Sequence, residues 1–378
     1  MSHTPLRKLD HIRIVLDSDV EHTWKTTLFE HVELRHAALP ETNLGNVDTS
    51  IRFLGKRLEA PIMITGMTGG HEVAAEINCA IAKAAQELGL AMGVGSQRAA
   101  IERPELASTF SIARKCGPEI PLVANIGAPQ LVKGYSVAEV RKAIEMIDAD
   151  AVAIHLNAGQ EAFQPEGDTE YRGVLEKIAN IVAELDRPVI VKETGQGLSY
   201  EVALALRSRG VRFFDISGAG GTSWIKVEMY RAKARGMDKL ARGARVFSDW
   251  GIPTLQALME VRWASPDSCI IASGGIRTGL DVAKAIALGA DIAGVALPVI
   301  RAYGERLEKG VRDFLEQLVF ELRVALFLTG SSTLAELRKT ELDIDPTLRQ
   351  RLEARGIDTE LYLRGTRLLV EPGRSCSS

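Results

Sequence analysis

Eight short apolar runs alternate with helical patterns along the chain, and this alternation limits the possible fold more than any other feature. The runs are Pro61–Gly66, Leu90–Gly95, Pro121–Gly127, Ala151–Asn157, Pro188–Glu193, Phe213–Gly218, Cys269–Gly274 and Ile292–Leu297. The helical patterns include Val73–Leu88, Ser136–Ile147, Tyr171–Leu185, Tyr200–Arg209, Thr254–Trp263 and Leu280–Leu288. Strands rich in Val, Ile and Ala are typical of a parallel sheet covered on both faces, either a (β/α)8 barrel or an open doubly wound sheet. Eight strands close a barrel, and no early G-x-G-x-x-G turn marks a dinucleotide-binding half, so we favour the α/β TIM barrel.

The pattern also divides the chain into three parts. Residues 1–60 form an N-terminal segment that leads into the barrel, residues 61–330 the barrel, and residues 331–378 a C-terminal extension. Gly220–Arg245 is Gly-rich, basic and longer than an ordinary connection, which predicts a lid or a loop ordered by ligand. Gly304–Leu328 predicts an amphipathic helix packed on the outside, and the tail beyond Glu371 is predicted to be disordered.

Composition narrows the class of protein. The net charge of −3 argues against general nucleic-acid binding, and no apolar run approaches the ~20 residues of a membrane span. Met1–Arg13 is polar and lacks the apolar core of a signal peptide. The four cysteines show no paired or metal-ligand spacing, which predicts reduced thiols and a structural role for Cys116; they are Cys79, Cys116, Cys269 and Cys376. We therefore expect a cytoplasmic enzyme with neither a membrane nor a nucleic acid as partner.

A glycine turn follows the seventh predicted strand. The sequence Ser273-Gly274-Gly275-Ile276-Arg277 lies directly before the helical run Leu280–Leu288. Glycines allow backbone N–H groups to converge on an anion, and the helix N-terminus adds its positive dipole end. In TIM barrels the loops after strands seven and eight are the usual phosphate site, so the turn predicts a phosphorylated cofactor or substrate.

Polar residues gather at the other predicted strand ends, where barrel active sites lie. Cations among them suggest two anionic groups, because one phosphate would not need so many; these cations are Arg98, Lys192 and Arg277, with Arg7 and Lys8 in the N-terminal segment. Without further information, solvated side chains are the better interpretation of Arg7 and Lys8.

The fourth predicted strand ends in the run His155-Leu156-Asn157, with Gln160 and Glu161 just beyond. A lone strand histidine is more often a core residue than a catalyst. With these polar neighbours, a functional role and a structural role of His155 are about equally favoured. Glu161 has no His or Cys at ligand spacing, which excludes a typical zinc site. One carboxylate with waters and a substrate diphosphate is a common magnesium site; the alternative is a glutamate favoured by the helix dipole.

With these residues the chain resembles the type II, flavin-dependent isopentenyl-diphosphate isomerases, from Arg7 to beyond Leu328. The matching motifs are Arg7-Lys8-x-x-His11, Thr65-Gly66-Met67-Thr68-Gly69-Gly70, Gly95-Ser96-Gln97-Arg98, His155-x-Asn157-x-x-Gln160-Glu161, Val191-Lys192-Glu193, Ser217-Gly218-x-Gly220-Gly221-Thr222 and Gly274-Gly275-x-Arg277. The flavin cradle is shared with other FMN barrels, whereas the Arg-Lys pair and the His-x-Asn-x-x-Gln-Glu run are more specific.

The resemblance implies an FMN-binding barrel that interconverts isopentenyl and dimethylallyl diphosphate. It assigns FMN to Gly66, Met67, Thr68, Ser96, Asn125, Lys192, Ser217, Thr222, Gly274, Gly275, Arg277, Ala296 and Leu297. It assigns the substrate to Arg7, Lys8, His11, Ser96, Gln97, Arg98 and Gln160, which reverses the interpretation of Arg7 and Lys8 as solvated. Catalytic positions would be Gln160, His155 and Asn157, and Glu161 would hold Mg²⁺. Leu297 departs from the Arg that some members carry there, at a contact made by the backbone.

The chemistry of such an isomerase needs a cofactor, because ordinary side-chain acids rarely protonate an isolated alkene. Reduced FMN would carry the proton transfer, Gln160 would orient the substrate, and NADPH or another reductant would start turnover. The resemblance also implies a homo-oligomer, a tetramer or octamer.

Three alternatives belong to other classes. An FMN-dependent 2-hydroxyacid oxidase needs a histidine base at a late strand end, but the sixth strand ends Asp215-Ile216-Ser217-Gly218. A barrel like IMP dehydrogenase needs a nucleophilic cysteine in a mid-barrel loop, and the sequence has none there. A flavin- or phosphate-binding protein without activity stays open.

Overall fold

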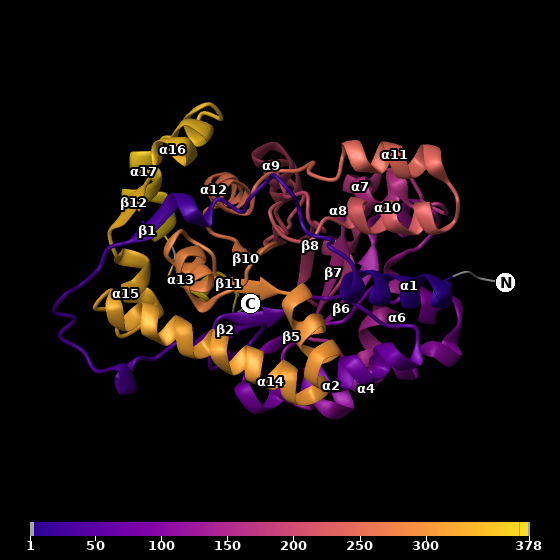
Figure 1. The fold of residues 1–378 in the computed structure, drawn as a ribbon, viewed down its shortest axis with the longest axis horizontal. Helices are drawn as coiled ribbons and strands as arrows, with labels where there is room; N and C mark the ends of the chain where they lie inside the picture. The colour runs from indigo at the N-terminus through magenta and orange to yellow at the C-terminus, as the bar shows by residue number, and fades with distance from the viewer. Residues whose placement is uncertain (1–3, 370, 377–378) are drawn as a thin grey trace.

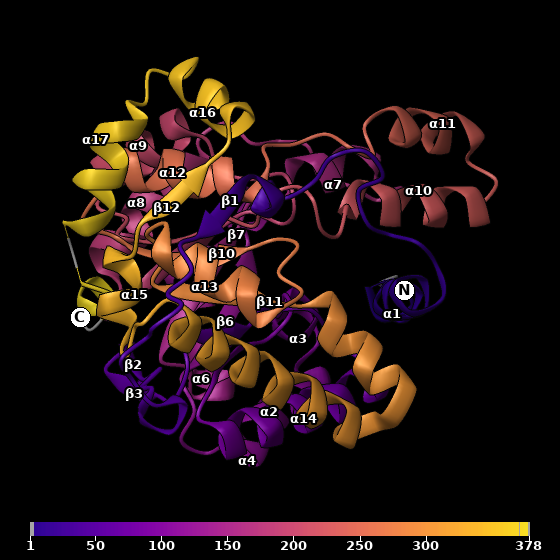
Figure 2. The same ribbon diagram turned by 60° about the vertical axis from the view of Figure 1, so that its left-hand side comes forward.

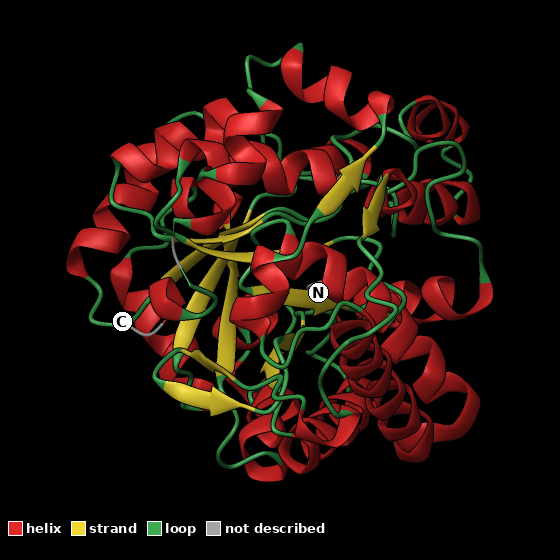
Figure 3. Cartoon of the chain, turned by 90° about the vertical axis from the view of Figure 1, so that its left-hand side faces the viewer, coloured by secondary structure: helices red, strands yellow, loops and turns green. Residues whose placement is uncertain are grey.

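The computed structural model describes residues 4–369 and 371–376, and it confirms the TIM barrel (Figures 1 and 3). Eight parallel strands close the barrel in the order β10-β11-β4-β5-β6-β7-β8-β9. They are β4 (Ile62–Ile64), β5 (Ala91–Gly93), β6 (Leu122–Gly127), β7 (Ala151–His155), β8 (Val189–Lys192), β9 (Phe213–Asp215), β10 (Cys269–Ser273) and β11 (Ile292–Val295). Each lies within a predicted run. The strands are buried almost throughout, which explains their continuous apolar sequence.

Helices surround the barrel and enclose the apolar core between themselves and the strands. They are α2 (Glu72–Leu88), α3 (Arg98–Glu102), α4 (Ser108–Cys116), α5 (Ala128–Val132), α6 (Val137–Ile147), α7 (Ala158–Phe163), α8 (Val174–Glu184), α9 (Tyr200–Ser208), α12 (Thr254–Ala264), α13 (Gly279–Ala287) and α14 (Leu297–Leu328). Local caps define several starts; α6, for example, begins with a capping box between Ser136 and Glu139. The outer helix predicted at Gly304–Leu328 is the second part of α14, which bends at Arg306 and Leu307.

The two ends of the chain meet beside the barrel. Strand β1 (Val32–Leu34) pairs antiparallel with β12 (Leu342–Ile344), and β2 (Ile51–Phe53) pairs with β3 (Lys56–Leu58). The remaining helical elements of the ends are α15 (Leu334–Lys339), α16 (Pro346–Glu353), α17 (Thr359–Arg364) and the short 3-10 helices Phe29–His31, Leu44–Asn46, Thr366–Leu368 and Arg374–Cys376; one more, Pro104–Leu106, precedes α4. None of the described helices is long and apolar enough to cross a membrane.

The first helix, α1 (Thr4–Asp17), packs against both α14 and α10 (Trp224–Ala234), and Figure 2 shows it beside α10. Helix α10 and the following α11 (Asp238–Val246) occupy the connection predicted as a lid or a loop ordered by ligand, so most of it is helical, and the lid role stays a prediction. Gly220, Gly221 and Gly236 lie outside the helices of this stretch and Gly243 lies within α11, while Ile225, Val227 and Glu228 give α10 a buried face.

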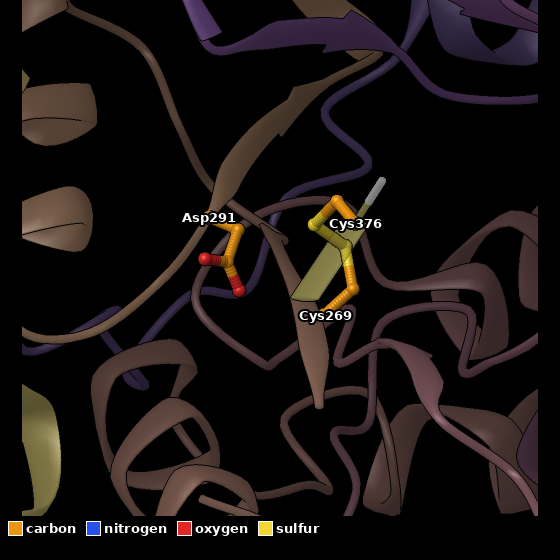
Figure 4. Close-up of side chains that lie close together, drawn as sticks. All are labelled: Cys269, Asp291 and Cys376. Carbon is orange, nitrogen blue, oxygen red and sulfur yellow. A yellow bond between two sulfur atoms is a disulfide. The ribbon is translucent and has the colours of Figure 1, made fainter. Parts of the chain in front are cut away.

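The cysteines are paired, against the prediction of reduced thiols. Cys79 on α2 bonds Cys116 on α4, and Cys269 at the start of β10 bonds Cys376 near the C-terminus (Figure 4). Spacing could not show either pair, because 37 and 107 residues separate the partners. The Asp291 carboxylate approaches the second pair, but it accepts hydrogen bonds from Arg262 and from the Gly373 N–H.

The same contacts correct the prediction of a disordered tail. Residues 371–376 end in a 3-10 helix, the Leu54 N–H donates to the Cys376 carbonyl, and the disulfide fastens the segment to β10. Residues 377–378 lie outside the described part of the chain, as do residues 1–3.

Reducing the disulfides is expected to lower the stability of the fold. Chain-entropy arguments give about 2–4 kcal/mol for a typical disulfide, because the cross-link restricts the unfolded chain. Guanidinium unfolding with and without dithiothreitol measures the effect. The double variant Cys269→Ala/Cys376→Ala should reproduce part of it, and its remaining response to reductant should come from Cys79–Cys116. Equal midpoints for the oxidised and reduced wild type would contradict the prediction.

Candidate active site

A cavity of about 1400 Å³, counting its opening to solvent, lies at the carboxyl ends of the barrel strands, with α1 at its mouth. Of the residues predicted for the site, those that line it are Arg7, Lys8, His11, Gly66, Met67, Thr68, Ser96, Arg98, Asn125, His155, Asn157, Gln160, Glu161, Lys192, Ser217, Thr222, Gly274, Gly275, Arg277, Ala296 and Leu297. Segments more than 250 residues apart thus share one mouth, as the barrel requires.

Gln97 is the predicted site residue that does not line this cavity. Its side chain is fully buried, donates to the Ala143 carbonyl at 2.8 Å and accepts from the Asn125 N–H at 2.9 Å. The side chain therefore points into the protein beside Ser96 and Arg98, and it holds the backbone of Asn125. A substrate contact through Gln97 does not fit this structure.

The glycine turn after β10 has the geometry of a phosphate cradle. Gly274 and Gly275 adopt φ values of +98° and +77°, which favour glycine. A Cβ atom on Gly274 would lie 2.2 Å from the Gly218 carbonyl oxygen, so only glycine allows the two loops to approach so closely. Thr278 caps the N-terminus of α13 directly behind the turn. Because no side chain occupies the turn, an anion can approach its backbone at the start of α13.

Lys192 lies at the end of β8 on the cavity floor. Its Nζ donates to the Glu193 carbonyl at 2.6 Å and lies 4.0 Å from Asp215 Oδ2. Ser273 Oγ donates to the other oxygen of Asp215 at 2.5 Å. Burial raises the pKa of Asp215, although the Lys192 charge opposes the shift. Nearby, Thr68 Oγ1 is buried and has no hydrogen-bond partner among the described residues.

His155 and Asn125 form a fixed pair on the neighbouring strands β7 and β6. His155 Nδ1 lies 2.7 Å from Asn125 Oδ1, and Asn125 Nδ2 donates to the Val94 carbonyl at 3.0 Å. That second bond leaves the Asn125 oxygen to accept from His155. Burial, with the charges of Lys192, Lys8 and Arg7, lowers the pKa of His155 to about 3. The imidazole is therefore neutral near pH 7 and is a poor proton donor.

Glu161 is held by three hydrogen bonds on the first turn of α7. Asn157 Nδ2 donates to Oε1 at 2.8 Å, while the Asp168 N–H and Gln164 Nε2 donate to Oε2 at 2.7 and 3.2 Å. Tyr171 in turn donates to Asn157 Oδ1 at 3.0 Å. Burial raises the pKa of Glu161, and the hydrogen bonds oppose the shift. The carboxylate is fixed in place beside the cavity, as a magnesium ligand requires.

A buried carboxylate that the sequence did not reveal links several side chains on the substrate side of the cavity. Glu228 of α10 is fully buried and accepts from His11 Nε2 at 2.8 Å, Gln160 Nε2 at 3.1 Å and Arg231 at 2.6 Å. Burial opposes its ionisation, but His11 and Arg231 lower the pKa of Glu228 to about 2. The sequence contains one indication of this role, the spacing of Glu228 and Arg231 by three residues. That spacing forms an ion pair only on a helix, so the stretch would first have to be predicted as helical.

The α1 cations lie at the opposite side from the glycine cradle. Lys8 is buried, and burial together with the Arg7 charge lowers its pKa to about 7, although Glu228 opposes the shift. Arg7 lies 3.9 Å from Glu166, and its Nε has no hydrogen-bond partner among the described residues. Arg98 donates to Glu102 at 2.7 Å, is about one-third exposed, and also lines the cavity. The buried Nε of Arg7, without a partner among the described residues, fits an anionic guest.

Comparison with known proteins assigns the family. A sequence profile of the FMN-dependent dehydrogenase family matches residues 2–113 and 122–344. The isopentenyl-diphosphate delta-isomerase of Ignicoccus hospitalis is 53% identical over 359 residues, which are 94% of this chain and 98% of that protein. The chain belongs to the isopentenyl-diphosphate delta-isomerase family. Enzymes of this name from Sulfurisphaera tokodaii and Aeropyrum pernix are 51% and 52% identical, over 94% and 97% of this chain and 96% of each relative. The chain is thus an enzyme of an FMN-dependent family.

Solved structures confirm the fold. A mandelate oxidase variant with benzaldehyde superposes with a TM-score of 0.63 at 20% identity, over 89% of this chain and 94% of that one. At this identity the likeness concerns the barrel and carries no information on the substrate.

Proposed function

We propose that the protein converts isopentenyl diphosphate into dimethylallyl diphosphate, with FMN as cofactor, Mg²⁺ on the diphosphate and NADPH as the reductant of the flavin. One observation carries the proposal. A single cavity joins a glycine cradle for one phosphate to a separate set of cations and a carboxylate for a second anion, in a chain about half identical to enzymes of that name.

The residues around the glycine cradle fit FMN. The turn has room for a phosphate because neither glycine carries a Cβ, and Arg277 lies beside it. Thr68 offers a buried hydroxyl that has no hydrogen-bond partner in the described part of the chain, and Lys192 offers a cation on the cavity floor. We infer that the phosphate binds Gly274, Gly275, Arg277 and the Ala296-Leu297 turn. The ring would lie among Gly66, Met67, Thr68, Ser96 and Asn125, and Lys192, Ser217 and Thr222 would hold the ring and the ribityl chain.

The second anion would be the substrate diphosphate. Arg7, Lys8, His11, Ser96 and Arg98 would surround it, and Glu161 would hold Mg²⁺ against its oxygens. Three fixed donors already orient Glu161, so the carboxylate needs no rearrangement to bind the ion. The carbon chain would then extend from the diphosphate toward the flavin side.

The chemistry divides between cofactor and protein. When bound and reduced, FMN supplies proton transfer to an unactivated alkene and stabilises developing positive charge. Gln160 orients the substrate, and Glu228 holds Gln160 in position through its amide. We assign orientation to His155 and Asn157 as well, because the neutral imidazole is fixed by Asn125 and cannot serve as a strong acid.

The low pKa of Lys8 predicts a pH dependence. Below about pH 7 the free enzyme carries a charged Lys8 that attracts diphosphate, and above it the charge is lost, so kcat/KM should fall as the pH rises through 7. Arg7 of α1 and Glu228 of α10 are the charged groups that act on Lys8. A pH series of kcat/KM measures this fall. In Lys8→Arg the fall above pH 7 should disappear, because the guanidinium stays charged. If kcat/KM of the variant falls above pH 7 as in wild type, Lys8 does not bind the diphosphate.

The function is tested with purified protein, FMN, dithionite or NADPH, Mg²⁺ and isopentenyl diphosphate. We expect dimethylallyl diphosphate by NMR, dependence on reduction and on magnesium, and no oxidation of lactate or glycolate. Flavin binding without product, or oxidase activity, would overturn the proposal. We further propose that the protein is cytoplasmic and forms a homo-oligomer, a tetramer or an octamer. Light scattering would measure the mass of this oligomer.

A further inference from the structure

The segment of residues 18–27, named here the strap, crosses the loops that follow β9 and β10. Its backbone pairs with the loop after β9: the His22 N–H donates to the Gly221 carbonyl at 2.9 Å, and the Ser223 N–H donates to the Val20 carbonyl at 2.8 Å. Glu21 forms a β-bridge with Thr222. The strap follows α1 directly, so it links the helix that carries Arg7 and Lys8 to the loops of the glycine cradle (Figure 2).

Glu21 is the charged centre of the strap. Its Oε1 accepts from Nε of Arg277 at 3.1 Å and from a second nitrogen of the same guanidinium, while its Oε2 accepts from Arg301 at 3.0 Å. All three side chains are about one-third exposed, at 31%, 31% and 34%. Two arginines from opposite sides therefore share one carboxylate.

Arg301 completes the connection to α1. Beyond Glu21, its guanidinium donates to the carbonyls of Val15 and Ser18, both at 3.4 Å, at the C-terminal end of the helix. A cation at this end is favoured by the helix dipole. The contacts thus run without interruption from the phosphate cradle through Arg277, Glu21 and Arg301 to α1.

We propose that Glu21 is a positioning residue that couples the cofactor phosphate to the substrate-binding helix. This inference rests on the proposed function. A phosphate on the glycine cradle competes with Glu21 for the donors of Arg277. As Arg277 turns to the phosphate, the Glu21 carboxylate is left to Arg301, and the Glu21–Arg301 pair holds the last turn of α1 more firmly. FMN binding thereby tightens the site of Arg7 and Lys8.

Riboflavin separates this effect from direct contact between the flavin ring and the substrate, because it has the same ring and no phosphate. The probe for the substrate site is inorganic pyrophosphate with Mg²⁺, measured by calorimetry on protein saturated with either flavin. We expect pyrophosphate to bind wild type about five-fold or more tighter with FMN than with riboflavin, the lower end of typical coupling. By reciprocity, pyrophosphate should strengthen FMN binding by the same factor relative to riboflavin.

Variants locate the coupling. Glu21→Gln should bring the FMN-to-riboflavin ratio of pyrophosphate affinities close to one, and Arg301→Gln should do the same through the other half of the link. Glu33→Gln is the matched control, since Glu33 is exposed in β1 and makes no ion pair within the described part of the chain; its ratio should equal that of wild type. Circular dichroism shows that each variant is folded, and if one is not, the other carries the test.

Amide exchange over α1 gives a second readout. FMN should slow exchange of α1 more than riboflavin does in wild type, and equally in Glu21→Gln. A ratio near one in wild type, or a wild-type ratio in both variants, overturns the inference and leaves the proposed function standing. Failure of wild type to bind FMN would instead overturn the proposed function.

Discussion

Replacing Gly274 by Ala is expected to weaken FMN binding by about a hundred-fold or more, or nearly 3 kcal/mol, while the barrel stays folded. The added Cβ would lie 2.2 Å from the Gly218 carbonyl oxygen and 2.5 Å from the Gly218 nitrogen. Both neighbours are backbone, so the loops after β9 and β10 must move apart and the cradle is lost. Flavin fluorescence titration measures the affinity.

The matched control for this change is Gly134→Ala. Gly134 also has a positive φ, +112°, but no heavy atom lies within 4 Å of its added Cβ. The control therefore carries similar backbone strain without a clash, and it should keep wild-type FMN affinity. Equal loss in both variants would attribute the effect to general destabilisation, and retention of FMN by Gly274→Ala would place the phosphate elsewhere.

Replacing Glu161 by Gln is expected to reduce magnesium-supported turnover about a thousand-fold, since a bound cation contributes several kcal/mol to charge stabilisation. The amide keeps the size of the side chain and removes the charge that binds Mg²⁺. FMN affinity should be unchanged, because Glu161 lies on α7, on the side of the cavity that carries the substrate residues.

Glu170→Gln is the control for the second change. Glu170 lies nine residues further along the chain, is half exposed, and makes its ion pair with Arg172 on the surface. A magnesium titration of kcat/KM compares the two variants with wild type. If Glu161→Gln retains the wild-type response to magnesium, the carboxylate is not the metal ligand.

The strands were predictable because each is buried on both faces and therefore apolar along its whole length. Pro121–Gly127, for example, contains the whole of β6 (Leu122–Gly127). Their number implied the closed barrel, and the parallel pairing of β6, β7 and β8 brings Asn125, His155 and Lys192 to one mouth. The polar residues at the strand ends could be predicted as site residues because parallel strands all end at the same edge of the barrel.

Local sequence could not show contacts that depend on distant partners. Gln97 stands between two cavity residues, but its direction follows from the carbonyl of Ala143, 46 positions away. The glycines and the length of Gly220–Arg245 did not reveal α10, which the packing of Ile225 and Val227 stabilises and which buries Glu228. The partner of Cys269 lies 107 residues away, and only the folded chain brings Cys376 beside β10.

A crystal structure of the protein with FMN, Mg²⁺ and inorganic pyrophosphate tests the central claim most directly. The account predicts the flavin phosphate on Gly274 and Gly275, and pyrophosphate with the metal between Arg7, Arg98 and Glu161, both inside one cavity. Pyrophosphate density on the glycine turn, or FMN bound outside the mouth of the barrel, would contradict it.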